Sequence, residues 1–362
     1  MAKKIKEDPS SPLQQIQSYL EQHKGDHYNF EEDRIYTVSS GSLLLDIEMG
    51  GGIKPGVVRA SGVTEGGKTS CGLSFAKNFQ KMDNSMVIYI KSEGRLSVDL
   101  IERMGIDTDS KKWFVFKCNV YETVINFMRQ MVKDNPTDTR YMFIIDSMDA
   151  LVPRGDLEKG ADEALKVGGG ALLTSDFLRR MALGLATRGH ICYMISQVRS
   201  TIKINPYEKT NPQVTNASGG NAALHYSDWI LEFQPRYVKD MITSQAAGKG
   251  DHLGHWCKVV FRKSPNEKTG IGVRYPIRYG RTGGKSIWVE YEVLDMLLMW
   301  EMASAKGAWV TISDELIEEL DAKGLELKKQ HQGVDNLRKY LEENKDIGKY
   351  LFRKFREVLK KS

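Results

Sequence analysis

A glycine-rich octapeptide constrains the fold of this chain more than any other stretch. Residues 62–69 read GVTEGGKT, which fits the phosphate-binding pattern G-x-x-x-x-G-K-[ST]. The mostly apolar residues 57–60 predict a strand before it, and the apolar spacing in 70–79 predicts a helix after it. A strand, a glycine loop and a helix N-terminus together form a cradle of N–H groups for a polyphosphate. A chance glycine turn is the alternative, and the matching flanks make it the weaker one.

The motif also assigns roles to single residues. The ammonium group of Lys68 is expected to bind the β- and γ-phosphates, and the hydroxyl of Thr69 is expected to bind Mg²⁺. Further nucleotide contacts are expected from the loop and from the residue that follows it: Gly62, Glu65, Gly66, Gly67 and Ser70.

Strand and helix patterns alternate through the first two thirds of the chain. Strands are predicted at 35–38, 86–90, 113–116, 141–146 and 191–196, and helices at 43–47, 96–104, 122–133 and 171–187. This alternation predicts an α/β fold with a mostly parallel sheet covered by helices on both faces. Residues 229–233 and 256–261 are predicted as two strands that can pair antiparallel at the end of this core.

Polar residues follow three of these strands, at the sheet edge where ligands bind. Asp146 ends an apolar run, which is typical of a carboxylate that holds nucleotide-bound Mg²⁺; a helix cap is the alternative. Glu93 follows a strand expected beside the strand of the phosphate loop. Its carboxylate there could polarise an attacking water, or cap the next helix. Gln197 could contact the γ-phosphate, or be only a polar strand end.

Residues 199–218 show neither the helical nor the strand spacing of apolar residues. Such long irregular segments in compact domains are usually functional or disordered. They contain three basic residues against one glutamate, and isolated isoleucines. This composition favours a loop that binds a phosphate backbone and wedges between bases. A second loop, 155–163, is acidic, and glycines at its far end could supply N–H groups instead. The candidate DNA-binding residues of the two loops are Arg199, Ile202, Lys203, Lys209, Gly219, Gly220, Gly168 and Gly169.

Length and composition limit the number of domains, the compartment and the partners expected for this chain. The 362 residues suffice for one large domain with appendages or for two domains, and no apolar run approaches the roughly 20 residues that cross a bilayer. The four cysteines are far apart, which indicates reduced thiols and, with no secretory signal, a cytoplasmic protein without a membrane partner. Residues 324–362 hold eleven Lys/Arg and six Asp/Glu, which accounts for the whole net charge of +5.

Two helices at the ends of the chain have open interpretations. An amphipathic helix predicted within 12–20 either folds back on the core or docks on another subunit. In the last helix, Lys349, Arg353, Arg356 and Lys360 line the face opposite an apolar stripe. That basic stripe is either a solvated face or a surface that captures duplex DNA.

From about residue 32 to residue 359 the chain resembles the RecA-type DNA strand-exchange recombinases. The supporting stretches include Glu93, Asp146-Ser147 and Gln197-Val198-Arg199. The other matching stretches are SSGSLLLD at 39–46, the phosphate loop, ALVP at 150–153, GGNA at 219–222, GAW at 307–309 and residues 333–346. The order and spacing of this set distinguish a recombinase from other ATPases that share only the phosphate loop.

The resemblance implies a RecA-like ATPase core at 34–282, an N-terminal oligomerisation arm at 1–33 and a small basic α/β domain at 283–362. It implies an ATP- and Mg²⁺-dependent enzyme that forms filaments on single-stranded DNA and exchanges strands with homologous duplex. Single-strand-binding and loader proteins are further implied partners. Glu93 resembles the catalytic carboxylate and Gln197 the residue that couples nucleotide to DNA. Lys263 resembles a basic residue that reaches the neighbouring subunit's γ-phosphate.

The chain departs from the family pattern at several positions. Ser97 and Leu100 stand where an acid and a tyrosine often contact adenine, and Arg262 adjoins Lys263 where the bacterial basic pair is split. The chain also ends without an acidic tail, as a bacteriophage or otherwise distant member would. The alternatives are a hexameric helicase of the same ATPase class and a protein-regulating ATPase that ignores DNA.

Overall fold

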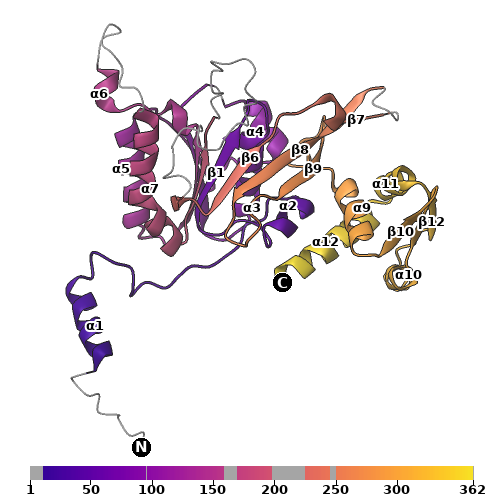
Figure 1. Ribbon diagram of the computed structural model, residues 1–362, viewed down its shortest axis with the longest axis horizontal. Coiled ribbons are helices and arrows are strands. Elements are labelled where there is room, and N and C mark those ends of the chain that lie inside the picture. The colour runs from indigo at the N-terminus through magenta and orange to yellow at the C-terminus, as the bar shows by residue number, and fades with distance from the viewer. Residues whose placement is uncertain (1–10, 95, 159–168, 198–224, 245–249, 362) are drawn as a thin grey trace, which may run out of the picture.

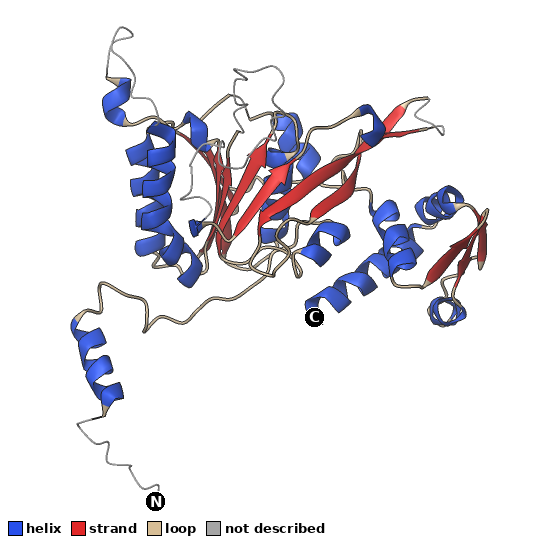
Figure 2. Cartoon of the chain, viewed as in Figure 1, coloured by secondary structure: helices blue, strands red, loops and turns tan. Residues whose placement is uncertain are grey.

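The computed structural model describes residues 11–94, 96–158, 169–197, 225–244 and 250–361. A large sheet with helices on both faces forms the body of the chain, and a small sheet with its own helices lies beside it (Figure 1). Figure 2 separates the red strands of the two sheets from the blue helices that cover them. In the part of the chain so described, no helix is long and apolar enough to span a membrane.

The large sheet has the strand order β3-β2-β4-β5-β1-β6-β8-β7, with β9 paired to β8. From β3 to β6 all neighbours are parallel, whereas β8 pairs antiparallel with β6, β7 and β9. The mixed α/β architecture and the antiparallel pairing of the two late strands are therefore confirmed. The strands are β1 (Gly56–Gly62), β2 (Ser85–Lys91), β3 (Trp113–Lys117), β4 (Arg140–Asp146), β5 (Ile191–Ile195), β6 (Trp229–Phe233), β7 (Met241–Thr243), β8 (His252–Lys263) and β9 (Gly272–Arg278).

Helices cover both faces of this sheet. The helices in the first 187 residues are α1 (Pro12–Gln22), α2 (Leu43–Glu48), α3 (Lys68–Phe79), α4 (Val98–Met104), α5 (Tyr121–Lys133), α6 (Arg154–Leu157) and α7 (Gly169–Thr187), with short 3-10 turns η1 (Met148–Ala150) and, later, η3 (Val238–Asp240). The apolar face of α3 packs on one side of the sheet, and α5 and α7 pack on the other. The core therefore has three layers, as the alternating pattern predicts.

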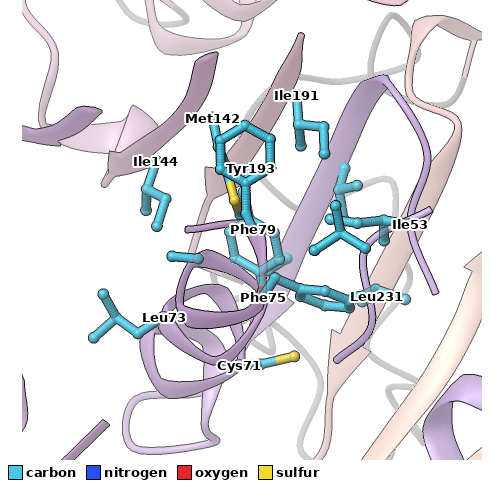
Figure 3. Packing of buried hydrophobic residues seen from close by; sticks show 14 of the residues in the cluster. Ile53, Cys71, Leu73, Phe75, Phe79, Met142, Ile144, Ile191, Tyr193 and Leu231 are labelled. Atoms are coloured by element: carbon cyan, nitrogen blue, oxygen red, sulfur yellow. The ribbon is translucent and has the colours of Figure 1, made fainter. Parts of the chain in front are cut away.

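The helix that follows the phosphate loop is held unusually close to the sheet. Phe75 and Phe79 of α3 are fully buried among strand residues that include Tyr193 and Leu231 (Figure 3). A Cβ at Gly72 would lie 2.7 Å from Cε1 of Tyr193, so only glycine permits this approach. The Tyr193 hydroxyl donates to the Lys68 carbonyl at 3.1 Å. This contact fixes the first turn of α3 against β5.

Two predictions about strands are wrong. Residues 35–38 do not form a strand: only Val38 pairs, in an isolated bridge to Ile53, and Ile35 is 78% exposed. Strand β2, which precedes Glu93, does not neighbour β1, because β4 and β5 lie between them. Consecutive strands in a chain are usually adjacent, and here the crossover from β1 to β2 skips two positions.

The last eighty residues build a second, smaller cluster. Its elements are α9 (Val289–Met299), β10 (Ala303–Lys306), β11 (Trp309–Ile312), α10 (Asp314–Asp321), β12 (Gln330–Gln332), α11 (Val334–Glu343) and α12 (Lys345–Lys361). The strands form an antiparallel sheet in the order β10-β11-β12. Buried residues of α9, α11 and α12 pack together with Leu43 and Leu44 of α2. This cluster therefore rests on the helix that precedes the phosphate loop.

The apolar stripe predicted for the last helix is largely confirmed, because Ile347, Leu351 and Phe355 are buried. The placement of Arg356 on the solvent-facing side of this helix is wrong. Its Nη2 lies 2.9 Å from Oδ2 of Asp46, a residue of α2 that is only 1% exposed. The helical period places Arg356 off the apolar stripe, but the buried carboxylate of α2 draws its guanidinium inward.

A second buried carboxylate, Glu292 of α9, gives the fold a pH dependence. It accepts hydrogen bonds from the hydroxyl of Ser42 and the N–H of Leu43. Burial, together with the charge of Asp46, raises the pKa of Glu292 from 4.5 to about 8, although the hydrogen bonds from Ser42 and Leu43 and the charge of Arg356 oppose the rise. Between these values the folded chain binds the proton more tightly than the unfolded chain. The free energy of unfolding therefore falls as the pH rises through this window.

Replacement of Glu292 by glutamine is expected to flatten this decline, because the amide does not titrate. Its oxygen can still accept the Leu43 N–H, and its NH2 group can donate to the Ser42 hydroxyl in place of accepting from it. The measurement is the melting temperature at several pH values from 5 to 9, for the wild type, Glu292→Gln and, as a control, Glu315→Gln at an exposed position of α10. The control is expected to follow the wild type. Equal slopes for all three proteins would contradict this role of Glu292.

Candidate nucleotide-binding site

The phosphate loop joins β1 to α3 at the carboxyl edge of the parallel sheet. Two of its glycines are required by their surroundings. Gly62 has φ +134°, and a Cβ there would lie 2.2 Å from the carbonyl oxygen of Phe233. Gly67 has φ +106°, and a Cβ there would lie 3.1 Å from Sγ of Cys257. The loop can therefore hold its backbone N–H groups close to an anion only with glycine at these positions.

Lys68 opens α3 and is largely buried. Its Nζ donates to the carbonyl oxygens of Gly62 at 2.8 Å and Val63 at 2.6 Å. Burial lowers the pKa of Lys68, and the negative charges of Asp146, Glu93 and Asp149 oppose that shift. The ammonium group is thus held inside the loop by two carbonyls. A bound phosphate would compete with these carbonyls for the hydrogen bonds that the ammonium group donates.

Thr69 and Asp146 come together as the sequence predicts. The Thr69 hydroxyl donates to Oδ2 of Asp146 at 2.9 Å, across 77 residues of sequence. The hydroxyl of Tyr89 donates to the same oxygen. Hydroxyl and carboxylate oxygens are the ligands that Mg²⁺ prefers, and a nucleotide supplies most of the rest, so this pair fits the predicted ion. The described residues contain no cluster of three or more His, Cys, Asp or Glu that would hold a metal without a nucleotide.

Tyr89 is a site residue that the sequence pattern does not reveal. It lies in the middle of β2, where an aromatic residue is expected simply to pack. Burial and the adjacent charge of Asp146 raise the pKa of Tyr89 far above its ordinary value. Its hydroxyl is therefore a permanent donor that orients the Asp146 carboxylate.

Glu93 and Gln197 lie at the same edge. The Glu93 N–H donates to the carbonyl of Asp146 at 3.4 Å, and its exposed side chain still acts electrostatically on Lys68. Gln197 follows β5, the direct neighbour of β1, and its N–H donates to Oδ2 of Asp149 at 2.6 Å. The fold thus brings Lys68, Thr69, Asp146, Glu93 and Gln197 to one edge of the sheet, although β2 is not beside β1.

Lys263 lies away from this edge. In the sheet, Gly62 of the loop pairs with Phe233, which pairs with Val259, whereas Lys263 stands opposite Ile230. Four residues along β8 separate Val259 from Lys263, which is about 13 Å. The Lys263 Nζ donates instead to the carbonyl of His225 at 2.8 Å. Lys263 is therefore not part of the phosphate site of its own chain.

Its neighbour Arg262 is committed elsewhere. Its Nε and Nη2 both lie 2.9 Å from the carboxylate of Glu232 in β6, which is 6% exposed. This bidentate pair raises the pKa of Arg262 and ties the residue to the sheet. Of the two adjacent basic residues, Lys263 is thus the one available to a second molecule.

A cavity of about 340 Å³ adjoins the phosphate loop, on the side of β8, β9 and α4. Leu100, Arg103, His255, Tyr279 and Gly280 are among its lining residues, as are Glu65 and Ser70, whereas Ser97 is not. Arg236 crosses its mouth: Nη2 donates to the Glu65 carbonyl at 3.2 Å and Nη1 to the Tyr279 hydroxyl at 3.1 Å. The volume falls in the range of small-molecule pockets, and the aromatic and apolar walls suit the base and ribose of a nucleotide.

Sequence reasoning did not find the cavity residues Arg236, His255 and Tyr279. Arg236 lies between β6 and η3, His255 lies in β8, and Tyr279 follows β9; the sequence pattern treats these segments only as strands and turns. A Tyr-Gly pair directly after β9 is the one local signal, and it does not by itself indicate a ligand.

Most of the candidate DNA-binding residues lie outside the described ranges: Arg199, Ile202, Lys203, Lys209, Gly168, Gly219 and Gly220. Gly169 is described, and it is the first residue of α7. The predictions made for these residues remain predictions.

The comparison with known proteins agrees with the geometry of the site about the family of this chain. Residues 18–265 match the family model of the RecA N-terminal domain. Protein RecA of Rippkaea orientalis is 28% identical over 330 residues, which cover 90% of this chain and 84% of that protein. Protein RecA of Picosynechococcus sp. is 29% identical over the same shares of each chain. Protein RecA of Petrotoga mobilis is 28% identical over 329 residues, or 89% of this chain and 79% of that protein. With a phosphate loop, a threonine–aspartate pair and a mostly parallel sheet in one arrangement, the chain belongs to the RecA family.

Proposed function

We propose that this chain is an ATP-dependent homologous recombinase that forms filaments on single-stranded DNA and exchanges strands with homologous duplex. The convergence of Lys68, Thr69, Asp146, Glu93 and Gln197 at one sheet edge is the observation that carries the proposal. The match to RecA proteins over about nine tenths of the chain supports the recombinase over other ATPases. In this proposal residues 34–282 are the ATPase core, and residues 283–362 are a C-terminal domain whose excess of basic residues lies in 324–362.

The side chains at this edge of the sheet have different roles in ATP hydrolysis. The backbone N–H groups of the phosphate loop and the ammonium group of Lys68 bind the triphosphate. Thr69 and Asp146 would hold Mg²⁺, which would offset the negative charge on the phosphate oxygens. Glu93 orients a water molecule and accepts its proton as it attacks the γ-phosphate. The amide of Gln197 contacts the γ-phosphate, so its surroundings differ before and after hydrolysis.

The position of Lys263 supports a site completed by a second subunit. Because it lies about 13 Å along β8 from the loop edge of its own chain, it serves the γ-phosphate of a neighbour rather than its own. Helix α1 supports the same assembly: none of its residues is buried, and Leu13, Ile16 and Tyr19 are each more than half exposed. This apolar stripe packs on the adjacent protomer, and repeated head-to-tail contacts build a filament.

Single-stranded DNA is the proposed ligand of residues 155–168 and 199–218 and of the glycines that follow each loop, and homologous duplex is the second substrate. Arg199, Lys203 and Lys209 contact phosphates, Ile202 inserts between bases, and the N–H groups of Gly168, Gly169, Gly219 and Gly220 bind the backbone. The basic segment 324–362 of the C-terminal domain holds incoming duplex. Single-strand-binding and loader proteins act on the same filament.

The rate of ATP hydrolysis with and without single-stranded DNA tests the proposal. Binding of the strand is expected to raise the rate, because it stabilises the subunit contacts that bring Lys263 to the neighbouring nucleotide. The same DNA as blunt duplex serves as the control. No stimulation, together with no filaments in electron micrographs, would contradict the proposal and favour a protein-regulating ATPase. Discrete hexamers with directional unwinding would favour a helicase.

A further inference from the structure

Arg59 is a charged residue where the fold requires an apolar one. It lies in β1, the strand that leads into the phosphate loop, and its side chain is 1% exposed. Its partners in the neighbouring strands, Met194 and Ile230, are apolar and fully buried. Burial of a guanidinium ion is costly unless an opposite charge and hydrogen bonds accompany it. The residue therefore calls for a specific explanation.

Asp149 supplies the opposite charge. Burial lowers the pKa of Arg59, and the negative charge of Asp149 opposes that shift. The Arg59 Nε also donates to Oγ of Ser196 at 3.0 Å. Asp149 belongs to η1, three residues after Asp146, and Ser196 directly follows β5. Arg59 thus joins the strand of the phosphate loop to the ends of the two strands that carry Asp146 and Gln197.

Asp149 also holds the backbone of Gln197. Its Oδ2 accepts the Gln197 N–H at 2.6 Å, a short bond of the kind that a charged acceptor makes. Its Oδ1 is buried and has no hydrogen-bond partner among the residues that the structure describes. The Asp149 carboxylate therefore balances the buried charge of Arg59 and also accepts one hydrogen bond, from the N–H of Gln197. A shift of the turn after Asp146 is therefore passed to Gln197 through this bond as well as through the pairing of β4 with β5.

We propose that Asp149 is a positioning residue that fixes Gln197 at the nucleotide edge, with Arg59 as its buried counter-charge. Through this bond the nucleotide state sets the affinity for single-stranded DNA. The inference rests on the proposed function and deepens it, because it names the element that couples the two ligands. Asp149 acts on the affinity for DNA through Gln197. Without the bond the Gln197 amide has no fixed position relative to the γ-phosphate, so the two binding events lose their coupling.

Two double variants isolate the bond from the charge pair. Arg59→Met with Asp149→Asn and Arg59→Met with Asp149→Ala both remove both buried charges, and methionine roughly keeps the length of the arginine side chain. The asparagine oxygen can still accept the Gln197 N–H, whereas alanine cannot. The two proteins therefore differ by one hydrogen-bond acceptor. A third variant, Asp109→Ala, removes a carboxylate that accepts the Lys111 N–H at 2.8 Å in a distant surface turn, and serves as the control.

The measurement is the affinity for fluorescent oligo-dT with a non-hydrolysable ATP analogue, divided by the affinity with ADP. The control and the asparagine variant are expected to keep the wild-type ratio within about threefold. The alanine variant is expected to lose at least about tenfold, within the range of ordinary coupling between sites. Thermal melting checks that each protein is folded. If the Arg59→Met background does not fold, Asp149→Asn and Asp149→Ala alone carry the same comparison.

The outcomes distinguish a failure of the positioning role of Asp149 from a failure of the proposed function. A wild type with nucleotide-dependent DNA affinity and two double variants with equal ratios would overturn the positioning role alone. A wild type with equal affinity in both nucleotides would overturn the proposed function, and the positioning role with it.

Discussion

Replacement of Lys68 by alanine is expected to lower the rate of ATP hydrolysis by about 100- to 1000-fold, the usual cost of one charge-stabilising donor at a reaction centre. The reason is the position of its ammonium group, which donates to the carbonyls of Gly62 and Val63 inside the phosphate loop. The measurement is the steady-state release of phosphate with saturating ATP and single-stranded DNA. Lys81→Ala, just beyond the same helix, is the matched control and is expected to keep the wild-type rate. A Lys68 variant that hydrolyses ATP normally would contradict the assignment of the loop.

The same variant also tests the shared site. Subunits with Lys68→Ala keep Lys263, and subunits with Lys263→Ala keep Lys68. If Lys263 serves the neighbouring nucleotide, each variant alone is inactive, and a mixture regains activity at interfaces that combine the two intact residues. Subunits with Lys68→Ala mixed with Lys68→Ala,Lys263→Ala subunits are the control, since no interface then holds both. Absence of recovery in the first mixture would contradict the arrangement in trans.

Replacement of Glu93 by glutamine is expected to slow hydrolysis by about 100- to 10,000-fold, the range for loss of a general base. The amide is isosteric but cannot accept the proton of the attacking water. Because the triphosphate stays intact, the variant is expected to remain in its DNA-binding state, so its complexes with ATP and single-stranded DNA dissociate more slowly than those of the wild type. Phosphate release and dissociation rates are the two measurements.

The matched control is Glu102→Gln, an exposed glutamate of α4 that is not among the lining residues of the cavity. It is expected to behave as the wild type in both measurements. A Glu93→Gln protein that hydrolyses ATP at the normal rate would exclude Glu93 as the base. A protein that loses DNA binding in ATP would show instead that Glu93 contributes to the fold of the site.

Local pattern was sufficient to predict the carboxyl edge of the sheet. The phosphate loop, Asp146 and Gln197 each follow an apolar run, and a parallel sheet brings the ends of its strands to one edge. The error about β2 did not move Glu93 from that edge, since all strands from β3 to β6 point the same way. The prediction that Glu93 lies at this edge depends on the direction of the strands and not on their order.

Contacts between distant segments were not predictable in this way. Arg356 meets Asp46 across 310 residues, and a helical wheel of either segment shows only a polar residue. Arg59 is only the one charged residue of a mostly apolar strand until β5 and η1 enclose it, and Tyr89 is expected simply to pack until Asp146 reaches its hydroxyl. In each case the partner depends on tertiary packing, which periodicity within one segment does not encode.

The most direct test of the account is the affinity of the wild-type protein for single-stranded DNA under three conditions: no nucleotide, ADP and a non-hydrolysable ATP analogue. Titrations at several salt concentrations would show how much of each affinity comes from phosphate contacts. The account predicts tight binding with the ATP analogue, accompanied by filaments in electron micrographs, and weak binding in the other two conditions. Equal affinity in all three would contradict it, because the edge of the sheet would then have no influence on the DNA.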